Sequence, residues 1–174
     1  MKISILLPYK ENYTKYCAGA VSLFVNQTLK LSKYKRNITV FGNTSYQAIL
    51  SKNYTNIPLY EKKLFGSQGK LYLNEFVKLQ KKIKPEIIEI HNRPIYLDYI
   101  KDLNSKFVLY FHNDPCQMEG SKKIKERMNL LSKCEKIIFN SLWTKNRFFD
   151  GIENFYSESA KTEVIRQCIN KKKI

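Results

Sequence analysis

Short, almost continuously apolar runs alternate along this chain with segments in which apolar residues recur at helical spacing. Residues 108–111 and 137–139 are the clearest of these runs. Strands that are apolar at every position are buried on both faces, as in parallel sheets whose crossover connections are helices. The alternation therefore predicts an α/β fold with a mostly parallel sheet that helices cover on both faces.

The expected elements follow from apolar periodicity and from the residues that begin or end helices. We expect strands at residues 3–8, 37–42, 86–90, 106–111, 136–139 and 162–165, and we interpret 57–60 as a further short strand. We expect helices at residues 19–32, 70–84, 94–103, 121–132 and 141–150. Ser121 and Ser141 are expected to cap the last two helices, and Pro85 and Gly151 to end helices.

The length of 174 residues fits one domain, which we place at residues 1–169. Residues 170–174 are interpreted as a basic tail or as the start of an interdomain linker. No apolar run approaches the roughly 20 residues of a membrane span. The apolar run at residues 3–8 is too short for a signal peptide and is not followed by a cleavage site, so we expect it to be a strand. Four scattered cysteines without a C-x-x-C pair suit a reducing compartment. We therefore expect a cytoplasmic protein, either free or peripheral to the inner face of the membrane.

The formal net charge of +16 raises the question of an anionic partner. Lysine supplies most of this charge and is spread along the whole chain, without arginine clusters, an RNP-type motif or zinc-finger spacing. Nucleic-acid binding is therefore disfavoured. Two interpretations stay open, namely lysine enrichment without a binding role and contact with an anionic membrane surface.

The two histidines of the chain end predicted strands in near-identical settings. His91 and His112 each follow an apolar run, and each is followed by Asn and, two residues further on, by Pro. In open α/β sheets, ligands bind outside the carboxyl ends of the strands. Two proton-carrying side chains at consecutive strand ends therefore predict a shared site. The alternative is that each histidine only ends its strand and bonds a backbone carbonyl.

No Walker loop, G-x-G-x-x-G, G-x-S-x-G or H-E-x-x-H motif is present. The small-residue turn at residues 17–22 contains Gly19 and lies between the first predicted strand and the first predicted helix. Such a turn exposes the amide groups at a helix N-terminus, which can bind phosphate. By itself this is a weak signal, because many helix starts look similar.

Several of these segments, taken in order, resemble a known family. They are the turn at 18–20 with its helix, the strand at 37–41, and the runs 87–92, 111–114, 137–144 and 162–170. Together they resemble the amino-terminal, acceptor-side domain of retaining glycosyltransferases of the GT-B fold, of the group 1 or family-four type. The resemblance implies a Rossmann-like three-layer sandwich, with a second domain that holds most of the nucleotide-sugar. The E-x7-E motif of that second domain has no place in this chain, and Ala18 stands where the family usually has a glycine.

The resemblance also implies a role for each matching residue. His112 is expected to be catalytic, beside the reacting sugar. The donor side is expected to include Gly19, Ala20, Asn140 and Ser141, of which Ser141 is better explained as a helix cap. The acceptor side is expected to include His91, Asn92, Arg93, Asn113 and Asp114. No metal and no cofactor are implied, since the nucleotide-sugar is a co-substrate; His91, His112 and Asp114 could hold a metal only if all three converged.

The expected function is that of the amino-terminal domain of a retaining, hexosyltransferase-like enzyme. It would move a sugar from a nucleotide-sugar to a hydroxyl acceptor, a glycan or glycolipid of the cell envelope, and would be inactive without its second domain. An uncovered apolar face toward that domain would favour self-association. The alternative is a non-catalytic binding module for an anionic membrane or glycan.

Overall fold

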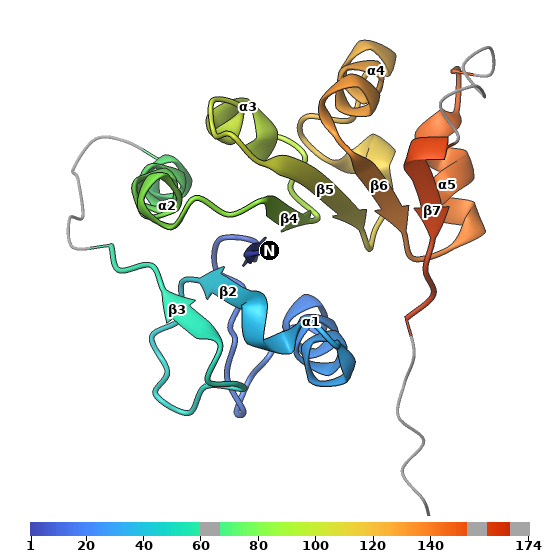
Figure 1. Ribbon diagram of the computed structural model, residues 1–174. Coiled ribbons are helices and arrows are strands. Elements are labelled where there is room, and N and C mark those ends of the chain that lie inside the picture. The colour runs from blue at the N-terminus through green and yellow to red at the C-terminus, as the bar shows by residue number, and fades with distance from the viewer. Residues whose placement is uncertain (60–66, 153–159, 168–174) are drawn as a thin grey trace, which may run out of the picture.

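The computed structural model describes residues 1–59, 67–152 and 160–167 (Figure 1). Seven strands form one sheet in the order β3-β2-β1-β4-β5-β6-β7. They are β1 (Ile3–Leu6), β2 (Ile38–Gly42), β3 (Tyr54–Asn56), β4 (Ile87–His91), β5 (Lys106–Phe111), β6 (Lys136–Phe139) and β7 (Thr162–Val164). Every neighbouring pair in this sheet is parallel, so the predicted parallel sheet is confirmed.

Helices lie on both sides of this sheet. They are α1 (Ala20–Leu31), α2 (Gln68–Ile83), α3 (Tyr96–Ile100), α4 (Ile124–Lys133) and α5 (Leu142–Phe149). Figure 1 shows α2, α3 and α4 on one side of the sheet and α1 on the other. The ring of Phe148 places α5 on the side of α2, because it packs on Phe111 and Phe139 in the apolar cluster that also contains Phe76 of α2. The predicted Rossmann-like three-layer sandwich is confirmed.

Two apolar clusters hold the layers together, one on each face of the sheet. Alternate strand residues point to opposite faces, so Leu6 joins the cluster under α2–α5 while Ile5 joins the cluster under α1. The cluster under α2–α5 is the larger and contains the buried rings of Phe41 and Phe76, whose centroids lie 5.5 Å apart. Each large apolar side chain removed from water contributes about 1.5–3 kcal/mol, so the larger cluster contributes more hydrophobic stabilisation than the smaller one.

The strand predicted at residues 57–60 is wrong. The ladder is formed instead by Tyr54–Asn56, in a polar stretch where the sequence shows no clear pattern. β3 lies at the edge of the sheet, where polar residues are tolerated because one side faces solvent. Ile57 is fully buried in the loop that follows, and its N–H donates to Gly42 O at 2.7 Å. Residue 60 lies outside the described residues.

The two predicted serine caps have different outcomes. The Ser141 Oγ accepts from the backbone N–H of Thr144 at 3.1 Å, which confirms it as the cap of α5. Ser121 does not cap α4, which begins only at Ile124. Its hydroxyl donates instead to Pro115 O within the preceding turn. The strand predicted at 3–8 and the helix predicted at 94–103 are correct in type, but the observed elements are shorter.

Because all strands are parallel, their carboxyl ends lie at one edge of the sheet, which we call the carboxyl edge. The loops that follow β1, β4, β5, β6 and β7 all begin there. Within the described ranges, no helix is long and apolar enough to cross a membrane. The expected basic tail at 170–174 lies outside the described residues.

Candidate functional site at the carboxyl edge of the sheet

The two histidines are in direct contact at the carboxyl edge. His91 is the last residue of β4, and His112 follows the last residue of β5. The His91 Nδ1 lies 2.8 Å from the His112 Nε2. Both imidazoles are buried, with Phe24 of α1 packed against them. The prediction that the two histidines lie at the same edge of the sheet is confirmed.

The hydrogen bonds around these rings run in one direction. The side-chain amide of Gln167 donates to the His112 Nδ1, so that nitrogen carries no proton. The proton of His112 is therefore on Nε2 and is donated to the His91 Nδ1. The His91 Nε2–H in turn donates to the Glu89 carboxylate at 2.7 Å, since an ionised carboxylate can only accept. This chain of four residues assigns a neutral tautomer to each histidine.

The electrostatics of the site favour the same protonation state. Burial, and to a lesser extent the neighbouring His91, lower the pKa of His112 to about 3. His112 is therefore neutral at pH 7. Its Nδ1 can accept a hydrogen bond from a ligand hydroxyl that replaces the Gln167 amide.

The backbone of His112 is held by two amide side chains from the neighbouring strand ends. The Asn92 Oδ1 accepts from the His112 N–H at 2.7 Å, and the Asn140 Nδ2 donates to the His112 carbonyl at 2.7 Å. Asn92 adopts the left-handed conformation, with φ of 53°, which asparagine tolerates better than most residues. The Asn140 Oδ1 accepts from the Thr144 hydroxyl of α5. The position of His112 is therefore fixed from both sides.

A pocket of about 300 Å³, here called the histidine pocket, opens beside His112. It brings together five of the predicted site residues: Ala20, Asn92, Arg93, His112 and Asn113. Four further residues line it that the sequence analysis did not identify: Pro8, Glu11, Val21 and Gln167. Glu11 and Gln167 lie in loops far apart in the sequence, so no local motif could identify them.

The amino terminus of α1, where phosphate binding was expected, carries an internal carboxylate. The Glu11 Oε1 accepts from the backbone N–H of Ser22 in the first turn of α1 at 3.0 Å. A side chain at Gly19 would collide with this carboxylate, so the glycine allows Glu11 to approach the helix. An external anion at Gly19 and Ala20 would therefore compete with Glu11.

Several predicted site residues do not line the histidine pocket. The Asp114 Oδ1 accepts from Cys116 N, and its Oδ2 lies 3.6 Å from the Arg147 Nε, so Asp114 stabilises the turn after β5. Ser141 caps α5, and His91 is fully buried beneath His112. Within the described part of the chain, no group of three or more His, Cys, Asp or Glu side chains is placed to hold a metal ion.

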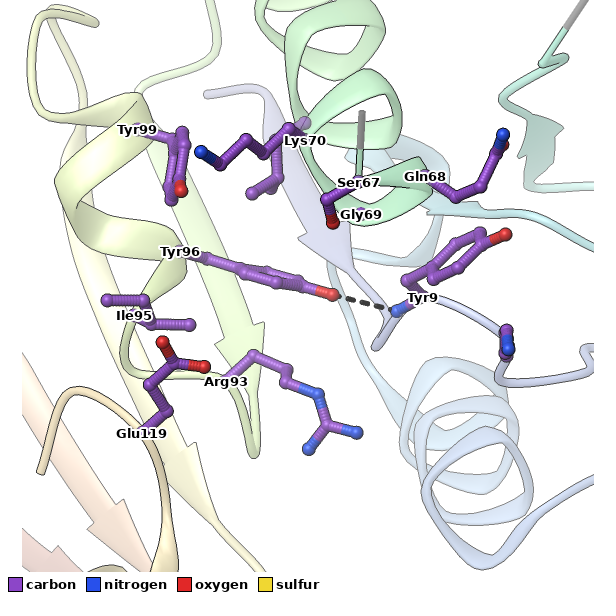
Figure 2. Close-up of a pocket in the computed structure, with 12 residues that line it drawn as sticks. Tyr9, Ser67, Gln68, Gly69, Lys70, Arg93, Ile95, Tyr96, Tyr99 and Glu119 are labelled. Carbon is purple, nitrogen blue, oxygen red and sulfur yellow. Dashed lines mark hydrogen bonds between the residues drawn. The ribbon is translucent and has the colours of Figure 1, made fainter. Parts of the chain in front are cut away.

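A second pocket of about 620 Å³, here called the tyrosine pocket, also has Arg93 in its lining (Figure 2). Tyr9, Tyr96 and Tyr99 contribute to its lining. Arg93 lines both pockets, so the two adjoin at this residue. Arg93 was expected on the acceptor side, but the tyrosines were not identified from the sequence: Tyr9 lies in the loop after β1, and Tyr96 and Tyr99 lie in α3.

The sequence matches no protein-family model, and no curated protein matches it significantly. Solved structures match its fold. The lipopolysaccharide outer core galactosyltransferase WaaB matches with a TM-score of 0.63 and 14% identity, over 100% of this chain and 48% of that one. Anabaena HepE in complex with UDP matches with a TM-score of 0.60 and 15% identity, over 97% of this chain and 44% of that one. Acinetobacter baumannii MurG matches with a TM-score of 0.53 and 7% identity, over 99% of this chain and 47% of that one.

These similarities define the class of fold. The chain has the fold of one domain of a GT-B glycosyltransferase and spans about half the length of the structures that it matches. At these identities the likeness concerns the fold alone.

Proposed function

We propose that this chain is the acceptor-binding, amino-terminal domain of a GT-B glycosyltransferase. The reaction is transfer of a sugar from a nucleotide-sugar to a hydroxyl acceptor, completed by a second domain. One observation carries the proposal: the histidine pocket lies at the carboxyl edge of the sheet, in a domain whose fold matches about half the length of GT-B glycosyltransferase structures. The UDP bound to the similar HepE supports a nucleotide-sugar as donor.

In this proposal His112 accepts a hydrogen bond from a hydroxyl of the transferred sugar. Its Nε2–H already donates to His91, so only Nδ1 is open to a ligand, once the Gln167 amide has moved. Asn92 and Asn140 hold the residue in place, which reduces the reorganisation needed when the substrate binds. His112 thus orients the reacting sugar, while Arg93 and Asn113 contact the acceptor from the rim of the pocket.

The donor diphosphate is proposed to approach Gly19 and Ala20 at the start of α1. The Glu11 carboxylate accepts a hydrogen bond from the N–H of Ser22 there, and its negative charge repels a second anion. We therefore expect Glu11 to weaken diphosphate binding in this domain alone. Replacing its charge while keeping its shape, in Glu11→Gln, should relieve that repulsion.

A titration of the isotope-labelled protein with UDP, followed by NMR, tests the proposal. We expect shifts at Gly19, Ala20 and His112, and an affinity about three- to tenfold higher for Glu11→Gln. Glu135→Gln is the matched control, because Glu135 is exposed and lies just before β6, away from the carboxyl edge. UDP shifts confined to other parts of the protein, or none at concentrations up to about 10 mM, would overturn the proposal.

A second domain would also cover apolar side chains that are exposed next to the site. Leu142 and Trp143, in the first turn of α5, are 61% and 59% exposed, and Ile165 follows β7 with 41% exposed. Because α5 begins just after β6, these side chains lie at the carboxyl edge. They support a domain interface at this edge.

A second candidate function is binding to an anionic membrane without catalysis. It is favoured by the net charge of +16 and by lysines exposed on α2: Lys70, Lys78, Lys81 and Lys82. This function predicts cosedimentation with phosphatidylserine vesicles at about 0.15 M salt and no response to UDP. The UDP titration therefore separates the two candidates.

A further inference from the structure

We propose that the tyrosine pocket binds an acceptor carbohydrate that carries a negative charge, either a carboxylate or a phosphate. The inference rests on the function proposed above and names the chemical class of its acceptor. The shape of the pocket, its charges, its aromatic rings and its connection to the histidine pocket support it.

The tyrosine pocket is large enough for a small oligosaccharide and open to solvent. Its volume of about 620 Å³ lies within the range of about 300–1,000 Å³ that is usual for small-molecule sites. Figure 2 shows α3 and the loop before it on one side, with Arg93, Tyr96 and Tyr99. The start of α2, with Lys70, and the loop after β1, with Tyr9, lie on the other side.

The charges that line this pocket are predominantly positive. Lys10, Lys70 and Arg93 contribute to the lining, against a single carboxylate from Glu119. Among the described residues, none of these three cations forms an ion pair with a carboxylate. By contrast, Lys106, Lys133 and Arg147 elsewhere in the chain are each paired. Three cations that form no ion pair with a carboxylate of the described residues lie around one concave surface, which favours an anionic ligand. The planar guanidinium of Arg93 suits a carboxylate or phosphate.

The aromatic rings favour a sugar over a simple anion. The Tyr96 ring is 5% exposed, and its hydroxyl accepts from the Tyr9 N–H at 2.9 Å, so both residues are fixed relative to each other. Tyr99 is 38% exposed and offers an open ring. A flat ring with a polar edge can pack against the C–H face of a sugar, while the hydroxyl groups of the sugar meet polar neighbours such as Gln68.

Arg93 connects the acceptor pocket to the site of the reaction. It lines both pockets and follows directly after Asn92, whose side chain holds His112 in place. An acidic group bound by Arg93 and Lys70 would therefore direct the rest of the acceptor along the carboxyl edge toward the histidine pocket. The acidic group fixes the acceptor, and a hydroxyl of another part of it is the one that reacts.

Isothermal titration of the 174-residue protein with three defined probes tests this inference. The probes are digalacturonate, glucose 6-phosphate and the neutral disaccharide maltose. We expect at least one acidic probe to bind about tenfold or more tightly than maltose. The stronger of the two acidic probes identifies whether the pocket prefers a carboxylate or a phosphate. Equal binding of the acidic and neutral probes, or no binding of any, would overturn the proposal.

Matched variants distinguish the pocket from a general effect of positive charge. Arg93→Met should lower the affinity for the acidic probe about tenfold, and Tyr99→Ala should lower it for acidic and neutral sugars alike. Arg36→Met is the control, because Arg36 lies just before β2, at the opposite edge of the sheet. If Arg36→Met and Arg93→Met lower the affinity for the acidic probe equally, the probe binds by overall charge and the tyrosine pocket is not its site.

The acidic-sugar titration and the UDP titration can fail independently of each other. If the acidic sugars do not bind while UDP still shifts the signals of Gly19 and His112, the proposed class of acceptor is wrong and the glycosyltransferase proposal still holds. Absence of the UDP response, with acidic sugars bound in the tyrosine pocket, would remove the enzyme proposal and leave a module that binds acidic glycans.

Discussion

Two adjoining pockets lie at the same edge of the sheet but differ in the state of their polar groups. Around the histidine pocket, His91 and His112 are buried, and each ring nitrogen has a partner within the protein. In the tyrosine pocket, Lys10, Lys70 and Arg93 are exposed and have no carboxylate partner among the described residues. The ring nitrogens at the histidine pocket are all hydrogen-bonded without a ligand, while the tyrosine pocket holds positive charge that no carboxylate of the described residues neutralises.

The difference indicates a division of labour. A buried hydrogen-bonded chain holds one atom, the His112 Nδ1, in a fixed place and protonation state, which suits contact with a reacting group. Long exposed side chains adjust to ligands of varied shape, which suits recognition of an acceptor. Substitutions in the histidine pocket should therefore change folding stability, and substitutions in the tyrosine pocket should change binding.

The largest effect is expected for His91→Ala. The His91 ring is fully buried, and its loss would leave a cavity, the His112 Nε2–H without an acceptor and the Glu89 carboxylate without its donor. These terms together predict a loss of about 3–4 kcal/mol in the free energy of unfolding, measured with urea. In the tyrosine pocket, Tyr99→Ala should cost less than about 1 kcal/mol. Similar costs for the two variants would break the contrast between the pockets.

The next effect is a dependence of stability on pH that His112 causes. Its pKa is lowered from the ordinary 6.5 to about 3 in the folded protein, chiefly by burial. Between these two values the unfolded chain binds the proton more readily, so stability should fall as the pH drops from 6.5 toward 3. At about pH 4 the loss should reach at most about 3 kcal/mol.

Urea unfolding of the wild type and of His112→Gln between pH 7 and about pH 4 measures this term. Gln removes the titrating group, so the variant should lose less stability than the wild type over the same interval. The rest of the chain is the same in both proteins, so the difference between the two slopes isolates the contribution of His112. Parallel slopes would show that His112 is not buried as neutral imidazole.

The sequence predicts the place of the two histidines well because the prediction depends only on topology. Once strands 86–90 and 106–111 are parallel neighbours, residues at their ends must meet at one edge. The remaining members of the site depend on tertiary packing. Glu11 and Gln167 come from loops whose path no local pattern encodes, and Asp114 is drawn into a turn with Cys116.

The same distinction explains the errors in the fold. The buried central strands were predicted correctly because continuous apolar runs are a strong signal. The edge strand Tyr54–Asn56 was missed because an edge strand needs no apolar face, and Ile57 and Leu59 suggested a strand where the chain forms a buried loop instead. Ser121 was misplaced because a serine can bond a turn carbonyl as readily as a helix N–H.

A smaller effect is expected for Glu89→Gln. The glutamine carbonyl can still accept from the His91 Nε2–H, but without the charge that strengthens the bond. We expect a loss of about 0.5–1.5 kcal/mol in the free energy of unfolding. Glu163→Gln, at the exposed face of β7, is the control and should cost less. If Glu89→Gln had no effect, the directed chain of hydrogen bonds would not contribute to the stability of the histidine pocket.

The smallest effect on stability is expected for Arg93→Met, which is also the sharpest test of the contrast. Arg93 is exposed, and its Nη1 donates to the neighbouring Asn92 carbonyl at 2.9 Å. Surface substitutions of this kind usually change stability by less than about 0.5 kcal/mol. We therefore expect an almost unchanged urea midpoint together with the tenfold loss of acidic-sugar binding described above. A loss above about 1 kcal/mol would mean that the guanidinium supports the Asn92 turn and, through it, His112. Arg93 would then belong to the rigid histidine pocket. Lys70 and Tyr99, but not Arg93, would count as side chains that serve only ligand binding.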